Sequence, residues 1–106
     1  MKFEEYQEII EDFAVYPRDN ELAAISYLAL GLNGEAGEVA DQVKKAIRND
    51  GHINDERREK IIEELGDVLW YLTRIAIEFD ASMADIAVNN VEKLQNRKRL
   101  NQLKHE

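Results

Sequence analysis

Hydrophobic residues recur at every third or fourth position along most of the chain, which is the spacing of one face of an α-helix, and no segment alternates like a β-strand. This pattern predicts four helices, roughly over residues 3–14, 21–48, 55–79 and 83–103. Pro17 breaks the chain between the first two segments. The pattern therefore favours an all-α protein.

Residues that cap helices support three of these beginnings. Asn20 precedes the second segment, and Asn54 or Asp55 can cap the third. Ser82 opens a Ser-x-x-Asp capping box before the fourth. Short connections favour antiparallel neighbours, so the predicted fold is a small four-helix bundle. The fourth helix has few apolar residues after Leu94, which suggests that another subunit covers it and that the chain forms a homo-oligomer.

Length and composition limit the class of protein. A chain of 106 residues fits one domain, spanning residues 1–106, and it contains no cysteine, which excludes disulfides and thiolate metal sites. No apolar run approaches the length of a bilayer span and the N-terminus does not read as a signal peptide, so we expect a soluble, cytoplasmic protein without a membrane partner. The net charge of −8, from 22 acids against 14 bases, disfavours DNA or RNA as the partner because phosphate contacts need a basic face.

The side chains present also limit the chemistry. The hydroxyls besides those of tyrosine belong to Ser26, Thr73 and Ser82, and none lies in a nucleophile-elbow motif. Neither a glycine-rich phosphate loop nor a Glu-x-x-His pair occurs. Any reaction must therefore use carboxylates, amides, lysine, arginine and water.

Two acidic motifs match each other in the second and third predicted helices. They read Glu35-Ala36-Gly37-Glu38 and Glu64-Leu65-Gly66-Asp67. At about 100° per residue, each pair of acids lies to one side of the apolar stripe of its helix, so four carboxylates are expected along the seam between the helices. The glycine within each motif permits close approach of another helix or of a ligand. The stripes are Ile25, Leu28, Ala29, Leu32, Ala36, Val39, Val43 and Ile47 in the second helix, and Ile61, Leu65, Val68, Leu69, Leu72, Ile75, Ala76 and Phe79 in the third.

Four carboxylates in one place need a counter-charge, because unneutralised acids repel one another and their pKa values rise. Mg²⁺ prefers oxygen ligands, keeps several waters, and is typically held by one or two carboxylates together with substrate phosphates. Acids three residues apart are also common on helices that face only solvent. The matching phase, glycines and apolar seams favour a metal site over that solvated surface.

A second group of polar residues lies in the fourth predicted helix. Asn90, Lys93 and Arg97 form one stripe close to the inward face of that helix. An amide and two cations that face inward suit bound phosphates. Lys45 adds positive charge about two turns beyond Glu38. The alternative interpretation is that these cations lie at the surface and complement helix C-terminal dipoles.

Two aromatic residues follow the second acidic motif. Trp70 is predicted to point away from the apolar stripe and to be exposed in a monomer, which suggests a subunit interface or, as a weaker alternative, a base-stacking surface. Tyr71 is predicted to lie on the same flank as the acids.

The paired motifs resemble a known family. Glu35-x-x-Glu38 followed by Glu64-x-x-Asp67 resembles the E-x-x-E…E-x-x-D signature of the all-α, MazG-like nucleotide pyrophosphohydrolases. The resemblance spans about residues 20–100. Further matching strings are Leu30-Gly31-Leu32, Val43-Lys44-Lys45, Asp67-Val68-Leu69-Trp70-Tyr71-Leu72 and Asn90-x-x-Lys93-Leu94-x-x-Arg97.

The resemblance implies an enzyme that hydrolyses a (d)NTP between its α and β phosphates to a monophosphate and pyrophosphate, as nucleotide-pool house-cleaning. It implies Mg²⁺ as the cofactor, with Mn²⁺ as an alternative ion, and homodimers or dimer-based tetramers whose sites a partner subunit completes. The implied metal ligands are Glu35, Glu38, Glu64 and Asp67. Glu38 is also the residue that we expect to orient or deprotonate the attacking water. The implied substrate-binding residues are Asn90, Lys93, Arg97 and Lys45.

Two alternatives stay open. A phosphoribosyl-ATP pyrophosphohydrolase would share the metal site and differ only in its substrate. A non-catalytic helical interaction module would carry the same acids on solvated faces.

Overall fold

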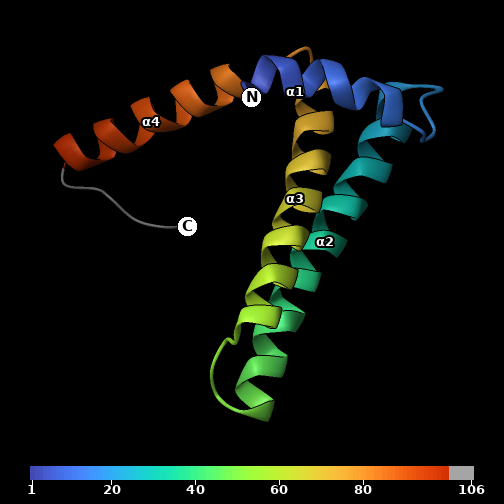
Figure 1. Cartoon of the computed structure of the whole chain (residues 1–106). Coiled ribbons are helices and arrows are strands. Elements are labelled where there is room, and N and C mark those ends of the chain that lie inside the picture. The colour runs from blue at the N-terminus through green and yellow to red at the C-terminus, as the bar shows by residue number, and fades with distance from the viewer. Residues whose placement is uncertain (101–106) are drawn as a thin grey trace.

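The computed structural model describes residues 1–100, and within them the chain is helical without a β-strand (Figure 1). The predicted all-α class and its four helices are confirmed. The predicted first helix continues past α1 as a tighter 3-10 turn, η1, and the end of the predicted fourth helix beyond residue 100 lies outside the described residues. Within residues 1–100, no helix is long and apolar enough to cross a bilayer. The elements are α1 (Phe3–Ile10), η1 (Glu11–Phe13), α2 (Glu21–Asn49), α3 (Asp55–Glu78) and α4 (Met83–Arg99).

The three longer helices begin at predicted cap residues. The side chains of Asn20 and Ser82 accept hydrogen bonds from backbone N–H groups of the first turn at 2.8 and 3.0 Å. Asn54, rather than the alternative Asp55, caps α3 in the same way at 2.8 Å. After α2 the chain turns at Gly51, whose φ of +76° is a conformation that glycine adopts without strain. Local hydrogen bonding therefore sets these helix boundaries.

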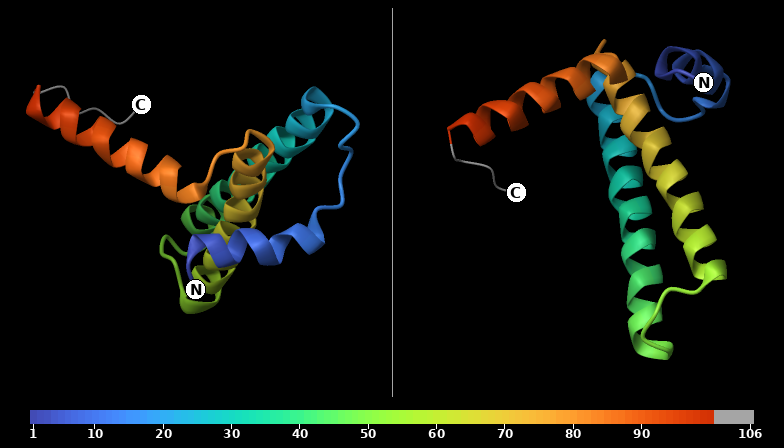
Figure 2. Two further views of the ribbon diagram at one scale, coloured as in Figure 1. Left: turned by 90° about the horizontal axis from the view of Figure 1, so that it is seen from above. Right: turned by 60° about the vertical axis from the view of Figure 1, so that its left-hand side comes forward.

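The long helices α2 and α3 lie side by side and antiparallel, and they form the main body of the chain (Figures 1 and 2). Helix α1 crosses the end of this pair that is remote from the α2–α3 connection. Helix α4 starts at that same end, contacts α1, and then extends away from α2 and α3. Covering of α4 by a second copy of the chain stays a prediction.

The seam between α2 and α3 is more polar than the apolar stripe that the sequence predicted. Val43 and Ile47, which belong to that stripe, are 37% and 75% exposed. The prediction was wrong at the C-terminal end of α2 because it assigned the inward positions to the largest apolar side chains. Gln42 faces α3 instead and accepts a hydrogen bond from Arg57 of that helix at 3.1 Å. The buried residues of α2 are Ala24, Leu28, Gln42 and Ala46.

Large apolar side chains remain at the surface of the single chain. Leu30 on α2 is 74% exposed, and Ile62 and Leu65 on α3 are 59% and 50% exposed. Leu65 also belongs to a predicted inward stripe, so that assignment was wrong within one chain. Ile62 and Leu65 are three residues apart and share one face of α3, and contiguous apolar surface that is exposed is typical of protein interfaces.

Trp70 is partly buried, and the prediction of an exposed tryptophan was wrong. Its ring meets Tyr16 edge to face at 6.4 Å between centroids and Tyr71 in the same way at 5.0 Å. Tyr16 belongs to the segment between η1 and α2, which covers this side of α3. Helical periodicity describes a helix alone and cannot anticipate such a covering segment.

A fully buried arginine, Arg74 of α3, fixes the segment that follows α1. Its guanidinium donates hydrogen bonds to Glu11 at 2.7 Å and to the Tyr16 hydroxyl at 2.9 Å. Tyr16 in turn donates to Glu78, which also pairs with Arg18 at 3.0 Å. The hydrogen bond from Arg74 is the main cause of the lowered pKa of Glu11. This network holds Tyr16 in place against Trp70.

Candidate metal centre

Three carboxylates from the paired helices converge at one point of the seam. Glu35 of α2 and Glu64 and Asp67 of α3 each place a carboxylate oxygen within 4.8 Å of the others. Residues three apart share a helix face, so Glu64 and Asp67 lie together, and the antiparallel α2 brings Glu35 opposite them. Glu35 and Glu64 are partly buried whereas Asp67 is exposed, so the group is accessible from solvent.

The pKa of Glu35 is raised by this arrangement. Burial is the largest cause, followed by a hydrogen bond with Glu64 and by the negative charges of Asp67, Glu64 and Glu38. The positive charge of a bound cation would favour the ionised carboxylates and so offset both the desolvation cost and the repulsion. The donors are all carboxylate oxygens, which is the set that Mg²⁺ prefers. The residues present therefore fit a divalent hard cation.

Glu38 lies one turn along α2 from Glu35 and is exposed. It is not among the three residues whose oxygens converge. Its charge nevertheless contributes to the raised pKa of Glu35, so it lies close to the same region. Of the four acids predicted to flank the seam, the structure brings three together and leaves Glu38 beside them.

A close approach of the two helices occurs next to the carboxylates, at Gly31 and Tyr71. A Cβ added at Gly31 would lie 2.1 Å from Cε1 of Tyr71, so the tyrosine ring occupies the space that a side chain would need. The sequence assigned this role to Gly37 and Gly66, but a Cβ at either would meet no atom within 4 Å in this chain. The sequence does contain an indication that Gly31 lies at the close approach. It is four residues before Glu35, and this spacing places both residues on the helix face that forms the seam.

Tyr71 lies near the carboxylates, in agreement with its predicted position on the same flank of α3 as the acids. Its pKa is raised, first by burial and then by the neighbouring groups of Tyr27, Glu35 and Asp67. The ring thus packs on α2 while the hydroxyl lies near the acids.

An apolar hollow of about 530 Å³ opens between α1, α3 and the start of α4. Phe3, Tyr6, Leu69 and Ala84 are among the residues that line it. The pKa of Tyr6 is raised, first by burial and then by the charge of Asp67. Sequence analysis missed this feature because it forms only where α1 crosses the helix pair.

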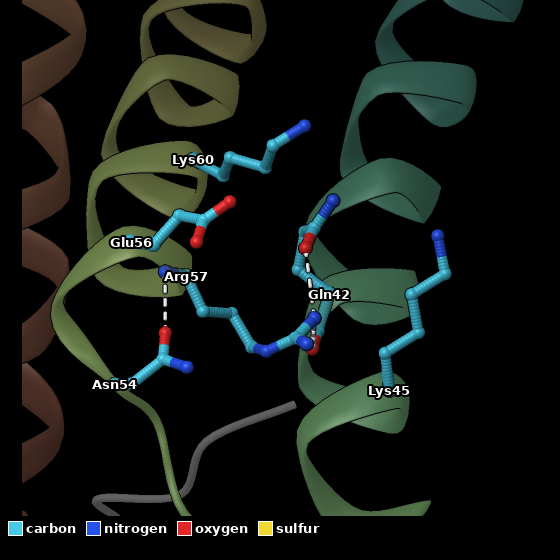
Figure 3. Close-up of a pocket in the computed structure, with 6 residues that line it drawn as sticks. All are labelled: Gln42, Lys45, Asn54, Glu56, Arg57 and Lys60. Carbon is cyan, nitrogen blue, oxygen red and sulfur yellow. Dashed lines mark hydrogen bonds between the residues drawn. The ribbon is translucent and has the colours of Figure 1, made fainter. Parts of the chain in front are cut away.

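A second hollow, of about 230 Å³, lies between α2 and α3 toward their connection (Figure 3). Lys45, a predicted substrate-binding residue, lines it, and its ammonium group pairs with Asp41 at 2.9 Å. We call this hollow the basic pocket. The residues that define it are Gln42, Lys45, Asn54, Glu56, Arg57 and Lys60.

The other predicted substrate-binding residues lie on α4. Asn90 and Lys93 are exposed, and Arg97 is partly buried. Because α4 extends away from α2 and α3, a single chain does not bring these residues to its own carboxylates (Figure 2). Their role in binding stays a prediction.

Comparison with known proteins identifies the family. The model of the MazG nucleotide pyrophosphohydrolase domain matches residues 24–100, a range that includes both acidic motifs and α4. The chain belongs to the MazG nucleotide pyrophosphohydrolase family. This MazG protein is 41% identical over 97 residues to the gene 37 protein of Mycobacterium phage L5, across 88% of this chain and 85% of the phage protein. No solved structure matches it. Membership of the MazG family confirms the resemblance stated from the paired acidic motifs.

Proposed function

We propose that this MazG protein is a Mg²⁺-dependent hydrolase that cleaves (d)NTPs to (d)NMPs and pyrophosphate, in nucleotide-pool house-cleaning. The observation that carries the proposal is the convergence of Glu35, Glu64 and Asp67 from two helices. Family membership supports a nucleotide pyrophosphohydrolase, and the oxygen-only donor set supports Mg²⁺, with Mn²⁺ as an alternative.

The chain offers a group for each part of this reaction. Glu35, Glu64 and Asp67 would hold the ion, which when bound neutralises phosphate charge and acidifies water. Glu38, exposed beside them, orients a water and accepts its proton. The water oxygen forms a bond to the α-phosphorus, and the bond from that phosphorus to the bridging oxygen breaks, so that pyrophosphate leaves with the electron pair.

The apolar hollow at the α1 end of the helix pair suits the nucleoside half of the substrate. Phe3 and Tyr6 offer aromatic faces for a base, and Leu69 offers apolar contact. Stacking is tolerant of base identity, because every base has an aromatic face. This hollow therefore supports binding of several nucleotides.

A partner chain would supply what a single chain lacks near the carboxylates. We propose a homodimer or dimer-based tetramer in which Asn90, Lys93 and Arg97 of α4 bind phosphate or sugar at the site of another copy. The direction of α4 and the exposed apolar residues Leu30 and Ile62 support such an assembly.

Product analysis with Mg²⁺ and a panel of NTPs and dNTPs tests the proposed reaction. Wild type and Glu63→Gln should both release monophosphate and pyrophosphate, whereas Glu64→Gln and Glu38→Gln should not. Glu63→Gln is the matched control, because Glu63 is the exposed neighbour of Glu64 and its replacement by glutamine removes the same single negative charge.

Other products would contradict the proposal. Diphosphate and orthophosphate would show cleavage of the wrong bond. Turnover of phosphoribosyl-ATP alone would favour the alternative enzyme, and an absence of product across a panel that includes it would favour the interaction module.

A further inference from the structure

The ring of Tyr71 is seated directly on the backbone of α2 at Gly31. A Cβ added at Gly31 would lie 2.1, 2.5 and 2.6 Å from Cε1, Cζ and Cδ1 of Tyr71, so one edge of the ring fills the place of the missing side chain. At each of the other four glycines of the chain, an added Cβ would meet no such atom within 4 Å. Gly31 is therefore a specific notch in α2, and the Tyr71 ring fills it.

This notch lies one helical turn from the carboxylates on both helices. On α2, Glu35 follows Gly31 by four residues. On α3, Asp67 precedes Tyr71 by the same four residues. Because the two helices run antiparallel, both steps go in the same direction along the pair and cover about 6 Å. The axial position of the ring in the notch thus sets which residues of α3 lie opposite Glu35.

Buried side chains do not fix the register of the two helices at the carboxylates. Interdigitating side chains are what hold packed helices in a fixed relative position. No residue of α2 between Leu28 and Gln42 is buried, and this is the stretch that carries Glu35. The notch at Gly31 lies within it. In this part of the seam, the ring of Tyr71 therefore interlocks α3 with α2.

The ring of Tyr71 is also packed against other aromatic residues. It meets Trp70 edge to face at 5.0 Å between centroids, and Trp70 meets Tyr16 at 6.4 Å. An ordinary contact needs at least 3.4 Å, which is 1.3 Å more than the 2.1 Å that a Cβ at Gly31 would have. Because close-packed neighbours oppose movement of the ring, part of this displacement has to fall on the helices.

Displacements of this size matter for a small cation. Mg²⁺ requires oxygens at about 2.1 Å in nearly ideal octahedral geometry, whereas Ca²⁺ accepts oxygens at about 2.3–2.6 Å in flexible geometry. A slip of one residue along the helix axis is about 1.5 Å. It would move Glu35 relative to Glu64 and Asp67, whose oxygens lie within 4.8 Å of its own. Loss of the register should therefore weaken binding of Mg²⁺ more than binding of Ca²⁺.

We propose that Tyr71, seated in the notch at Gly31, is a positioning residue that holds α2 and α3 in the register required for Mg²⁺ and so makes the carboxylates select Mg²⁺ over Ca²⁺. This inference rests on the proposed function for the identity of the ion. Tyr71 acts through the positions of the two helices and is not itself a ligand. The ring, rather than the hydroxyl group, carries this role.

The test is the ratio of the Mg²⁺ affinity to the Ca²⁺ affinity of the full-length protein without nucleotide. Each ion is titrated against bound Mn²⁺, and the released Mn²⁺ is followed by electron paramagnetic resonance. A smaller fraction of folded protein lowers both apparent affinities by the same factor, so their ratio does not depend on stability. The ratio therefore reports the geometry of the site even in a variant that is partly unfolded.

Gly31→Ala should lower this ratio about tenfold, which is the lower end of the effect usual for residues that orient metal ligands. Tyr71→Leu should lower it similarly, because leucine has no ring to fill the notch. Two controls should keep the ratio of wild type. Gly34→Ala adds a methyl group on the same helix where a Cβ meets no atom within 4 Å, and Tyr71→Phe retains the ring.

The inference and the proposed function fail in different ways. Hydrolysis that depends on Glu64, with the same ratio in all five proteins, would refute the role of Tyr71 and retain the proposed function. An equal loss in Tyr71→Phe and Tyr71→Leu would assign the effect to the hydroxyl group and overturn the inference. A ratio that depends on the ring, without hydrolysis of any nucleotide, would support the inference and refute the proposed function. Absence of Mn²⁺ binding by wild type would refute both.

Discussion

Replacing Gly31 by alanine should destabilise the α2–α3 pair, although the same replacement stabilises most helix interiors. Alanine is favoured over glycine there by about 1 kcal/mol. At Gly31, however, the new Cβ would lie 2.1 Å from Cε1 and 2.6 Å from Cδ1 of Tyr71, so the ring has to move. Overpacking of a filled site costs about 1–3 kcal/mol, which outweighs the helix preference and leaves a net loss of about 0–2 kcal/mol.

The chain provides matched controls for this substitution. A Cβ at Gly37 or Gly66 would meet no atom within 4 Å, so alanine at either position should stabilise by up to about 1 kcal/mol. Gly31→Ala and Gly37→Ala should therefore differ by about 1–3 kcal/mol in the free energy of unfolding. The assay is urea or thermal unfolding in EDTA at one protein concentration, because assembly shifts apparent stability.

A second substitution tests the cause. Removing the ring by Tyr71→Ala eliminates the clash, so the double variant should be less destabilised than the sum of the two single variants. Equal stabilities of Gly31→Ala and Gly37→Ala would refute the account of the seam given above. Additive effects in the double variant would show that the ring of Tyr71 is not the obstacle.

Three further predictions concern the metal site and the buried network. Mg²⁺ at one hundred times its dissociation constant should stabilise the folded chain by about 2.7 kcal/mol, and calorimetry should show that Glu64→Gln loses this gain while Glu63→Gln keeps it. Arg74→Met should destabilise by about 3 kcal/mol in urea unfolding, because it removes the buried cation that donates hydrogen bonds to Glu11 and to the Tyr16 hydroxyl, whereas Arg18→Ala should cost less than about 1 kcal/mol. The pKa of Glu11 lies below its ordinary value of 4.5, so its stabilising contribution is present above that pH and is lost as the pH falls through the lowered pKa; acid titration of stability should show a shallower loss in Glu11→Gln than in wild type.

The helices could be predicted from the sequence because their determinants are local. Asn20, Asn54 and Ser82 satisfy N–H groups of their own first turns, so each residue marks a boundary wherever the helix lies in space. The direction of α4 has no such determinant. It depends on contacts with α1 that no periodicity describes, and the partial burial of Trp70 depends in the same way on Tyr16.

The same distinction between local determinants and tertiary contacts applies to the candidate site. Glu35, Glu64 and Asp67 could be predicted, because spacing within a helix and antiparallel pairing together place them at one seam. The hydrogen bond from Arg57 to Gln42 was missed, since hydrophobic periodicity ranks Val43 and Ile47 above Gln42 as inward residues.

The shortage of large apolar side chains in the α2–α3 seam also determines how the protein responds to temperature. Withdrawal of apolar surface from water is the main source of the heat capacity change of unfolding. In the described part of the chain, the buried apolar residues are Ile10, Ala24, Leu28, Ala46, Ala76 and Met83, three of them alanines. A single chain should therefore have a small heat capacity change and a flat stability curve, with weak cold denaturation. Burial of Leu30, Ile62 and Leu65 by any partner surface would steepen that curve, so calorimetry of the assembled protein reports how much of this surface is covered.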